Sequence, residues 1–293
     1  MKQTNEADGW RNEAERTAGT HIEPGRSYGF FTDTTLCIGC KACEVACKEW
    51  NQLPAEAAAL TGMSYDNTGA LSATTWRHVA FVEQMAGDGE RPDGMPPLQS
   101  RWLMMSDVCK HCDPAPCLEA CPTGAIFRTE FDTVVVQQDI CNGCGYCVPA
   151  CPFGVVAVDE LDGKAHKCTL CYDRLKGGME PACSKVCPTE SIQFGEVDEL
   201  QERARDRVAA LHGRGVADAY LYGAPDTPGA TGGINQLNAF FLLLDRPETY
   251  NLPMAPSRPA ERIAPAFGTG LAVFAGLALA AAGLLTSGAG RHR

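Results

Sequence analysis

The sequence lacks several features that mark common functional classes. Acidic residues outnumber lysine and arginine by 36 to 25, and the net charge of −11 argues against nucleic acid as a partner. The stretch Met1–Arg26 has neither the apolar run of a secretory signal nor a twin-arginine pair, and we interpret residues 1–28 as a polar arm. No pterin, flavin or nucleotide motif is visible. The sequence therefore offers no site for bond chemistry, and we predict a non-catalytic chain.

Cysteine, in contrast, is abundant. All sixteen cysteines lie between residues 37 and 187, in four quartets that follow the pattern C-x2-C-x(n)-C-x3-C. Only the middle gap varies, with two, four, two and eleven residues. The quartets are Cys37, Cys40, Cys43 and Cys47; Cys109, Cys112, Cys117 and Cys121; Cys141, Cys144, Cys147 and Cys151; and Cys168, Cys171, Cys183 and Cys187. This internal repeat is the strongest signal in the sequence.

The spacing of the cysteines favours iron–sulfur clusters over disulfides or zinc. Disulfides staple small secreted domains, whereas this chain is long enough for a core, and cysteines two or three residues apart are hard to pair with each other. Structural zinc needs only two C-x2-C pairs for each site. A C-x2-C-x2-C loop wraps one cubane with three thiolates, and the fourth cysteine reaches the neighbouring cluster. Pro122, Pro152 and Pro188 follow the last cysteine of three quartets, where they help the chain leave the cluster loop.

The quartets can be paired in part from their separation. Only nineteen residues, from Pro122 to Ile140, separate the second quartet from the third, which is about the length of a hairpin. These two quartets should exchange their fourth cysteines and form one two-cluster ferredoxin unit, leaving the first and fourth quartets to form another. Spacing alone leaves a different pairing open, with the first quartet joined to the second and the third to the fourth.

Apolar patterns predict short strands around the cysteine loops and one amphipathic helix. The helix is expected at Val197–His212, where Leu200, Ala204, Val208 and Leu211 share a face. A Gly- and Pro-rich turn region occupies Gly87–Pro97. The expected strands are Trp76–Gln84, Arg101–Met105, Ala125–Phe127, Thr133–Val136, Val155–Val158, Ile192–Phe194 and Ala239–Leu244.

The last segment has the composition of a membrane helix. Ile263–Gly290 contains no charged residue, and Ala264–Leu285 is almost wholly apolar. At about 1.5 Å per residue, 22 residues span about 33 Å, which is enough for the core of a bilayer. Two arginines precede the segment and two follow it, so the positive-inside rule barely discriminates its orientation.

Several basic residues adjoin the cysteines. Positive charge beside an anionic cluster stabilises its reduced form, so lysines next to cysteines are candidates for raising cluster potentials. These lysines are Lys41, Lys48, Lys110 and Lys167. His111 lies between two cysteines of a complete quartet, and we interpret it as a neighbouring or solvated histidine rather than a ligand.

The motifs CIGCKACEVACKEWN, CNGCGYCVPACPFG and KCTLCYDR resemble those of the iron–sulfur (beta) subunit of membrane-bound respiratory formate dehydrogenases. That subunit belongs to the four-cluster ferredoxin-like subunits that serve molybdopterin oxidoreductases. The resemblance continues through SYDNTGALSATTW and GGINQLNAFFLLLDRPETYNLP into the final helix.

The resemblance implies an α+β fold of two nested, pseudo-symmetric ferredoxin-like units and one C-terminal transmembrane helix. Residues 29–196 would form the four-cluster domain with an insertion at 48–108, residues 197–262 an extension that packs on partners, and residues 263–290 the membrane helix. The implied ligands are Cys37, Cys40, Cys43 and Cys187 for cluster 1; Cys47, Cys168, Cys171 and Cys183 for cluster 2; Cys109, Cys112, Cys117 and Cys151 for cluster 3; and Cys121, Cys141, Cys144 and Cys147 for cluster 4. Some relatives replace one cysteine of the third quartet with tryptophan and hold a three-iron cluster. This chain keeps Cys144, so four 4Fe-4S clusters are expected.

The resemblance also implies a function and partners. Cluster 1 would face a molybdenum or tungsten catalytic (alpha) subunit that oxidises formate, and cluster 4 a haem b (gamma) subunit that reduces quinone. The protein would cross the bacterial cytoplasmic membrane once, with its clusters on the extracytoplasmic face. An alternative is the same relay for a hydrogenase or another molybdopterin oxidoreductase, and a further one is a self-contained quinone-reactive enzyme.

Overall fold

The computed structural model describes residues 21–55, 61–63, 65–84 and 101–288. Four features expected from the sequence lie wholly or partly outside these residues. They are the turn region Gly87–Pro97, other parts of the insertion at 48–108, residues 1–20 of the polar arm and the last two residues of the apolar segment.

A four-stranded mixed sheet joins distant parts of the sequence. Its strands are β1 (Tyr28–Asp33), β9 (Ile192–Glu196), β10 (Tyr220–Tyr222) and β12 (Ala239–Leu243), in the order β10-β12-β1-β9. β1 runs parallel to β12, with Phe30 opposite Ala239, and antiparallel to β9. The sheet therefore combines strands from the expected cluster domain and from the expected extension.

The two faces of this sheet carry different cores, because successive side chains of a strand point to opposite sides. Tyr28 and Phe30 of β1 pack among buried cysteines such as Cys43. Phe31 packs on the other side with Leu200 of α7 (Val197–Gly213). α7 matches the helix expected at Val197–His212, and its buried face is the one expected from the apolar pattern.

Short elements surround the cysteines. A hairpin of β2 (Arg77–Gln84) and β3 (Arg101–Val108) forms the largest of them. The short strand pairs are β4 (Cys112–Asp113) with β11 (Gln236–Leu237), β5 (Ile126–Arg128) with β6 (Val134–Val136), and β7 (Ala157–Val158) with β8 (Ala165–His166). The short helices are α2 (Ala42–Asn51), α3 (Pro116–Glu119), α4 (Cys147–Ala150), α5 (Tyr172–Lys176) and α6 (Ala182–Lys185). The expected strands are confirmed, although the one at Val155–Val158 is limited to its last two residues.

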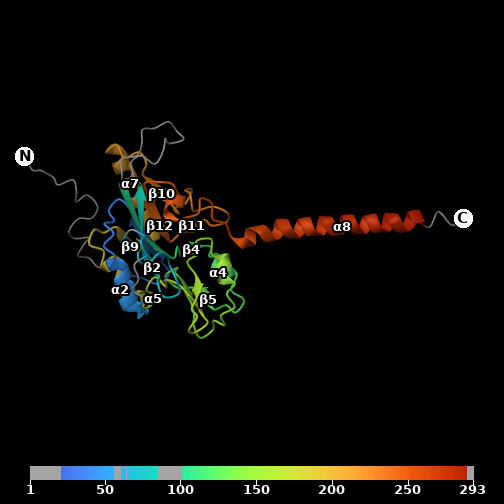
Figure 1. The fold of residues 1–293 in the computed structure, drawn as a ribbon, viewed down its shortest axis with the longest axis horizontal. Coiled ribbons are helices and arrows are strands. Elements are labelled where there is room, and N and C mark those ends of the chain that lie inside the picture. The colour runs from blue at the N-terminus through green and yellow to red at the C-terminus, as the bar shows by residue number, and fades with distance from the viewer. Residues whose placement is uncertain (1–20, 56–60, 64, 85–100, 289–293) are drawn as a thin grey trace, which may run out of the picture.

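The C-terminal helix α8 (Ile263–Gly288) leaves the domain as a single long rod (Figure 1). Two 3-10 turns, η2 (Pro247–Tyr250) and η3 (Pro259–Arg262), precede it. Its 26 residues extend for about 39 Å at about 1.5 Å per residue. Phe267 and Phe274 are 75% and 73% exposed, so none of the described residues covers the apolar surface that they form. Among the described residues, α8 is the one helix that is long enough and apolar enough to cross a membrane.

Candidate metal centres

Each quartet begins with the same tight turn. The residue before the second cysteine is left-handed in all four quartets, with φ of 65°, 45°, 72° and 58° at Gly39, His111, Gly143 and Leu170. This backbone conformation costs a residue with a β-carbon about 1–2 kcal/mol, so the fold holds His111 and Leu170 against their intrinsic preference. In the first and second quartets the turn brings the first two cysteines to one hollow.

Two hollows are each lined by four cysteines. The cysteines of the first hollow are Cys37, Cys40, Cys43 and Cys187, and those of the second are Cys109, Cys112, Cys117 and Cys151. In both hollows three thiols come from one quartet and the fourth comes from another.

The other eight cysteines gather in two more groups. Burial raises the pKa of the Cys47 thiol, and the neighbouring thiols of Cys168, Cys183 and Cys171 raise it further. Burial also raises the pKa of Cys147 to about 11, with added contributions from Cys141, Cys121 and Cys144. We number the four groups as sets 1 to 4, in the order used above for the implied clusters.

Electrostatic contacts between the sets follow one order. The charge of Cys183 in set 2 raises the pKa of Cys43 in set 1. In the same way, Cys109 in set 3 raises the pKa of Cys168 in set 2. Cys147 in set 4 raises the pKa of Cys117 in set 3. The cysteines of set 2 are all buried, whereas set 1 has the exposed Cys40 and set 4 has the exposed Cys144. The sets thus adjoin in the order 1-2-3-4, with an exposed thiol at each end.

The chemistry of these groups fits 4Fe-4S clusters. None of the sixteen cysteines forms a disulfide. Burial raises the pKa of the thiols of Cys43, Cys117 and Cys171 to about 12. Four converging thiols of this kind become thiolates only beside a cation, because burial and mutual repulsion both oppose their charge. Iron supplies that charge, and a cubane takes four cysteine thiolates.

His111 gives a second, independent sign of the fit. Its side chain is buried, and its Nδ1 accepts the N–H of Val134 at 3.0 Å, so the proton of the neutral ring lies on Nε2. That Nε2 has no hydrogen-bond partner among the described residues, yet His111 lines the hollow of set 3. The Nε2–H group could donate a hydrogen bond to a cluster sulfur there. Burial, with the nearby Lys167, holds the pKa of His111 well below its usual value, and the solvated position that we considered for it is wrong.

The lysines that adjoin cysteines have different surroundings. Lys110 and Lys167 are buried. Lys110 forms an ion pair with Asp107, whereas the ammonium of Lys167 donates to the carbonyl oxygen of Cys168 at 3.0 Å. Lys41 lies 3.5 Å from the carboxylate of Glu44.

The side chain of Lys48 contacts the insertion. Its ammonium donates to the hydroxyl of Thr75 at 2.8 Å and to the carbonyl oxygen of Thr74 at 3.0 Å. Lys48 thus ties the insertion to the helix α2.

A further cation, Arg77, was not expected from the sequence. It comes from the β2 strand and donates to the thiol of Cys183 at 3.2 Å. No motif could have revealed it, because Arg77 lies far from every cysteine in the sequence.

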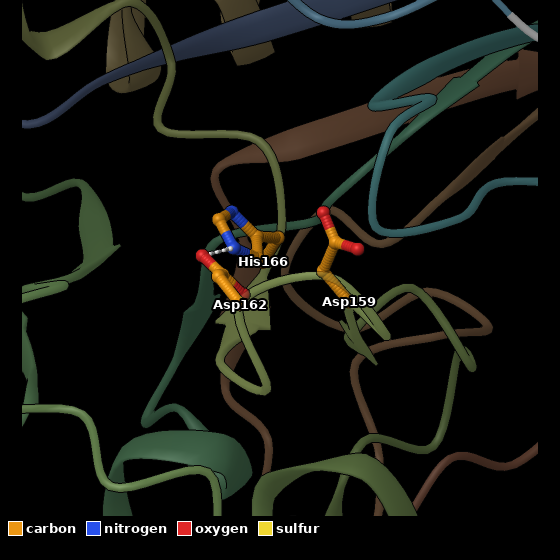
Figure 2. Close-up of side chains that lie close together, drawn as sticks. All are labelled: Asp159, Asp162 and His166. Carbon is orange, nitrogen blue, oxygen red and sulfur yellow. Dashed lines mark hydrogen bonds and ion pairs between the residues drawn. The ribbon is translucent and has the colours of Figure 1, made fainter.

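A cluster of Asp159, Asp162 and His166 lies outside the cysteine sets (Figure 2). The Nε2 of His166 lies 2.9 Å from a carboxylate oxygen of Asp162. Asp159 accepts the N–H of Leu161 and Asp162 accepts the N–H of Lys164, at 2.9 and 2.8 Å. These bonds close the turn between β7 and β8, and the cluster is explained as a turn without any ion.

The fold and the thiol sets define an iron–sulfur protein of the ferredoxin type. The family model of the 4Fe-4S dicluster domain matches residues 100–197. The sequence is 40% identical over 228 residues to the formate dehydrogenase iron-sulfur subunit of Haemophilus influenzae, covering 76% of this sequence and 68% of that protein. It is also 40% identical over 226 residues to the nitrate-inducible formate dehydrogenase iron-sulfur subunit of Escherichia coli, covering 76% and 71%.

A more distant relative is the B subunit of the anaerobic dimethyl sulfoxide reductase of Escherichia coli, which is 35% identical over 182 residues, or 62% of this sequence and 80% of that protein. The protein described here belongs to the family of formate dehydrogenase iron–sulfur subunits. It is an electron-transfer subunit that carries iron–sulfur clusters. Its relatives are named as subunits of formate dehydrogenases and of a dimethyl sulfoxide reductase.

Proposed function

We propose that this protein relays electrons through four 4Fe-4S clusters, from a formate-oxidising molybdopterin subunit to a membrane cytochrome b subunit that reduces quinone. The alpha subunit would carry molybdenum or tungsten. The observation that carries the proposal is the linear adjacency of sets 1 to 4, with exposed thiols at both ends. Each set of four cysteines would hold one cluster, which supplies a one-electron carrier.

The sharing of cysteines supports two nested ferredoxin-like units. Sets 1 and 2 draw their members from the first and fourth quartets, and sets 3 and 4 from the second and third. In this proposal residues 29–196 form the four-cluster domain, with the insertion at 48–108. Residues 197–262 then extend it toward the partner subunits.

The base of α8 supports the direction of the relay. Arg258, just before the helix, donates to the carboxylate of Glu119 at 2.8 Å. Glu119 belongs to α3, which carries Cys117 of set 3, and lies two residues before Cys121 of set 4. A helix anchored there would hold sets 3 and 4 on the side of the domain that is closer to the bilayer. Set 4 is then the exit toward the membrane subunit, and set 1 is the entrance.

Apolar side chains at both ends support contacts with partner subunits. Tyr146, two residues after Cys144, is 63% exposed, and Ile38, two residues before Cys40, is 59% exposed. We further propose that residues 263–290 cross the bacterial cytoplasmic membrane once, with the cluster domain on the extracytoplasmic face. Protease added to intact spheroplasts would then digest the cluster domain. Protection of the domain would reverse the assigned side.

A second candidate keeps the relay and changes the catalytic partner. The similarity to the dimethyl sulfoxide reductase subunit, of which this sequence covers 80%, favours a partner that reduces a substrate with electrons from the membrane. Co-purification separates the two candidates, because the bound catalytic subunit would be assayed directly for formate oxidation and for sulfoxide reduction.

The number of clusters is tested by metal analysis. The full-length protein, expressed without its partner subunits and purified anaerobically, should contain about sixteen irons and sixteen sulfides, since each cubane holds four of each. Zinc should be negligible. A reproducible preparation rich in zinc and poor in iron would rule out the assignment of the four sets.

The direction of the relay is tested with two matched variants, Cys40→Ser in set 1 and Cys144→Ser in set 4. Serine is a harder ligand than a thiolate and damages the local cluster. In the Cys144→Ser complex, formate should still reduce a dye that accepts electrons upstream, and three clusters should still give reduced EPR signals, while quinone reduction collapses. In the Cys40→Ser complex, no cluster of this subunit should be reduced at a useful rate. Rapid delivery of electrons to quinone by the Cys40→Ser complex would show that set 1 is not the entrance.

A further inference from the structure

Among the described residues, Arg77 heads the largest side chains that are fully buried, and it lies between sets 1 and 2. It begins β2 and is only 1% exposed. Its Nη2 donates to the Sγ of Cys183 in set 2 at 3.2 Å. Its Nη1 donates to the carbonyl oxygen of Ser106 at 3.2 Å and to the hydroxyl of Ser106 at 3.3 Å. That hydroxyl lies 3.2 Å from the Sγ of Cys43 in set 1. One guanidinium therefore reaches set 2 directly and set 1 through a single hydroxyl group.

Arg77 contacts a thiol sulfur rather than a carboxylate. Within the described residues, no carboxylate forms an ion pair with Arg77. The buried Glu44 of this region has other partners, because it lies 3.5 Å from Lys41 and accepts the N–H of Val79. Burial lowers the pKa of the guanidinium, but the charges of Cys183, Cys43 and Cys168 outweigh burial and raise it above its usual value.

The other contacts of Arg77 hold it in place. Its guanidinium carbon lies 4.7 Å from the centre of the Phe30 ring, which is itself buried in the sheet. A buried charge without a counter-charge costs several kcal/mol, so a buried arginine without a carboxylate partner needs anionic groups at the sulfur that it contacts. The thiolates of two neighbouring clusters would provide them.

We propose that Arg77 is a fixed cation shared by the clusters of sets 1 and 2, which raises the reduction potentials of both. The inference rests on the proposed assignment of clusters to these sets. Reduction adds one electron, and hence one negative charge, to a cluster. A neighbouring cation and a hydrogen bond to a cysteine sulfur both favour the more negative state. Arginine keeps its proton throughout, so the electron that enters from the upstream donor leaves to the next acceptor without a proton transfer by Arg77.

The two clusters are affected unequally. Set 2 receives a direct hydrogen bond through Cys183, whereas set 1 is reached only through Ser106. The larger effect is therefore expected at set 2. Loss of the Ser106 hydroxyl should affect set 1 alone.

The experiment compares four variants of the full-length protein in its assembled complex. Arg77→Met removes the charge and the hydrogen bonds, and Arg77→Lys keeps the charge. Ser106→Ala removes the link to Cys43 and leaves Arg77 in place. Arg101→Gln is the matched control, because Arg101 lies on the partner strand β3 and pairs with Asp245 at 2.7 Å, away from the thiols. Iron and sulfide are counted first, and an EPR-monitored redox titration then gives the potential of each cluster.

Arg77→Met should lower two of the four potentials. At the more affected cluster the equilibrium constant for reduction should fall at least tenfold, which corresponds to about 59 mV for one electron. Arg77→Lys should restore part of the loss, Ser106→Ala should lower one potential, and Arg101→Gln should leave all four unchanged.

Two results would overturn the proposal. One is an Arg77→Met complex with full iron and unshifted potentials, and the other is an equal shift of all four clusters. If the Arg77→Met complex fails to retain iron, the proposal is tested with Arg77→Lys and Ser106→Ala instead. Unchanged potentials in both of these variants would reject the role of Arg77. A wild-type complex without four titrating centres would instead refute the cluster assignment, so the two failures are distinguishable.

Discussion

Gly143 and Gly145 flank Cys144 and allow a sharp test of how the loop of set 4 is held. Both have left-handed backbone, with φ of 72° and 74°. A β-carbon at Gly143 would overlap the carbonyl oxygen of Gly163, in the turn between β7 and β8. A β-carbon at Gly145 would meet nothing within 4 Å. The variants Gly143→Ala and Gly145→Ala therefore share the same backbone strain and differ in steric overlap alone.

The structure sets the size of the difference. Left-handed backbone should cost each alanine about 1–2 kcal/mol. The overlap at Gly143 adds about 1–3 kcal/mol, because the obstacle is a backbone oxygen that cannot rotate away. At about 1.4 kcal/mol for each factor of ten, this increment raises the population of the opened loop by about 5- to 140-fold beyond that of Gly145→Ala.

The assay follows the loss of iron from the anaerobic complex in the presence of a chelator. Gly143→Ala should lose the EPR signal of one cluster much faster than Gly145→Ala, while the other three clusters are retained in both variants. The two variants would lose iron at the same rate if the contact with Gly163 did not position the loop, and that result would refute the reasoning.

Two further predictions concern attachment and stability. A protein truncated after Arg262 should keep its clusters and leave the membrane fraction when expressed without partners, because it lacks the exposed apolar side chains of α8. Identical fractionation of the truncated and full-length proteins would contradict an anchoring role for α8. Asp33→Asn should destabilise the domain by about 3–5 kcal/mol, because the buried carboxylate pairs with Arg207 at 2.7 Å and joins β1 to α7. Glu196→Gln, at the exposed pair with Arg26, should cost less than about 1 kcal/mol, and equal thermal shifts of the two variants would refute the distinction.

The sequence predicted the elements whose signals are local. The quartets are repeats of fixed spacing, and the helix at Val197–Gly213 has a clear apolar face. The strand β1 was missed, because all six of its residues are buried and no alternation of polar and apolar residues marks it. A strand covered on both faces gives no period-2 pattern. Its pairing with β12 depends on residues far away in the sequence.

The site was predicted less completely than the fold around it. Thiols can be grouped from their spacing, but the surroundings of the thiols depend on tertiary contacts. Lys48 adjoins Cys47 in sequence, yet its ammonium bonds to Thr75. Arg77 is remote from Cys183 in sequence, yet donates to its sulfur. Adjacency in the sequence is therefore a poor guide to the charges that a buried sulfur meets.

The parallel pairing of β1 with β12 has a consequence for how the protein is made. Phe30 and Ala239 are partners although about 200 residues separate them, and every cysteine lies inside the loop that this pairing closes. At about 5–20 residues per second, a ribosome needs about 10–40 s to synthesise that loop. The central sheet cannot close before all sixteen thiols have been made. We therefore expect that the cores on its two faces are sealed when the sheet closes, and that iron reaches the buried cysteines of set 2 before this step.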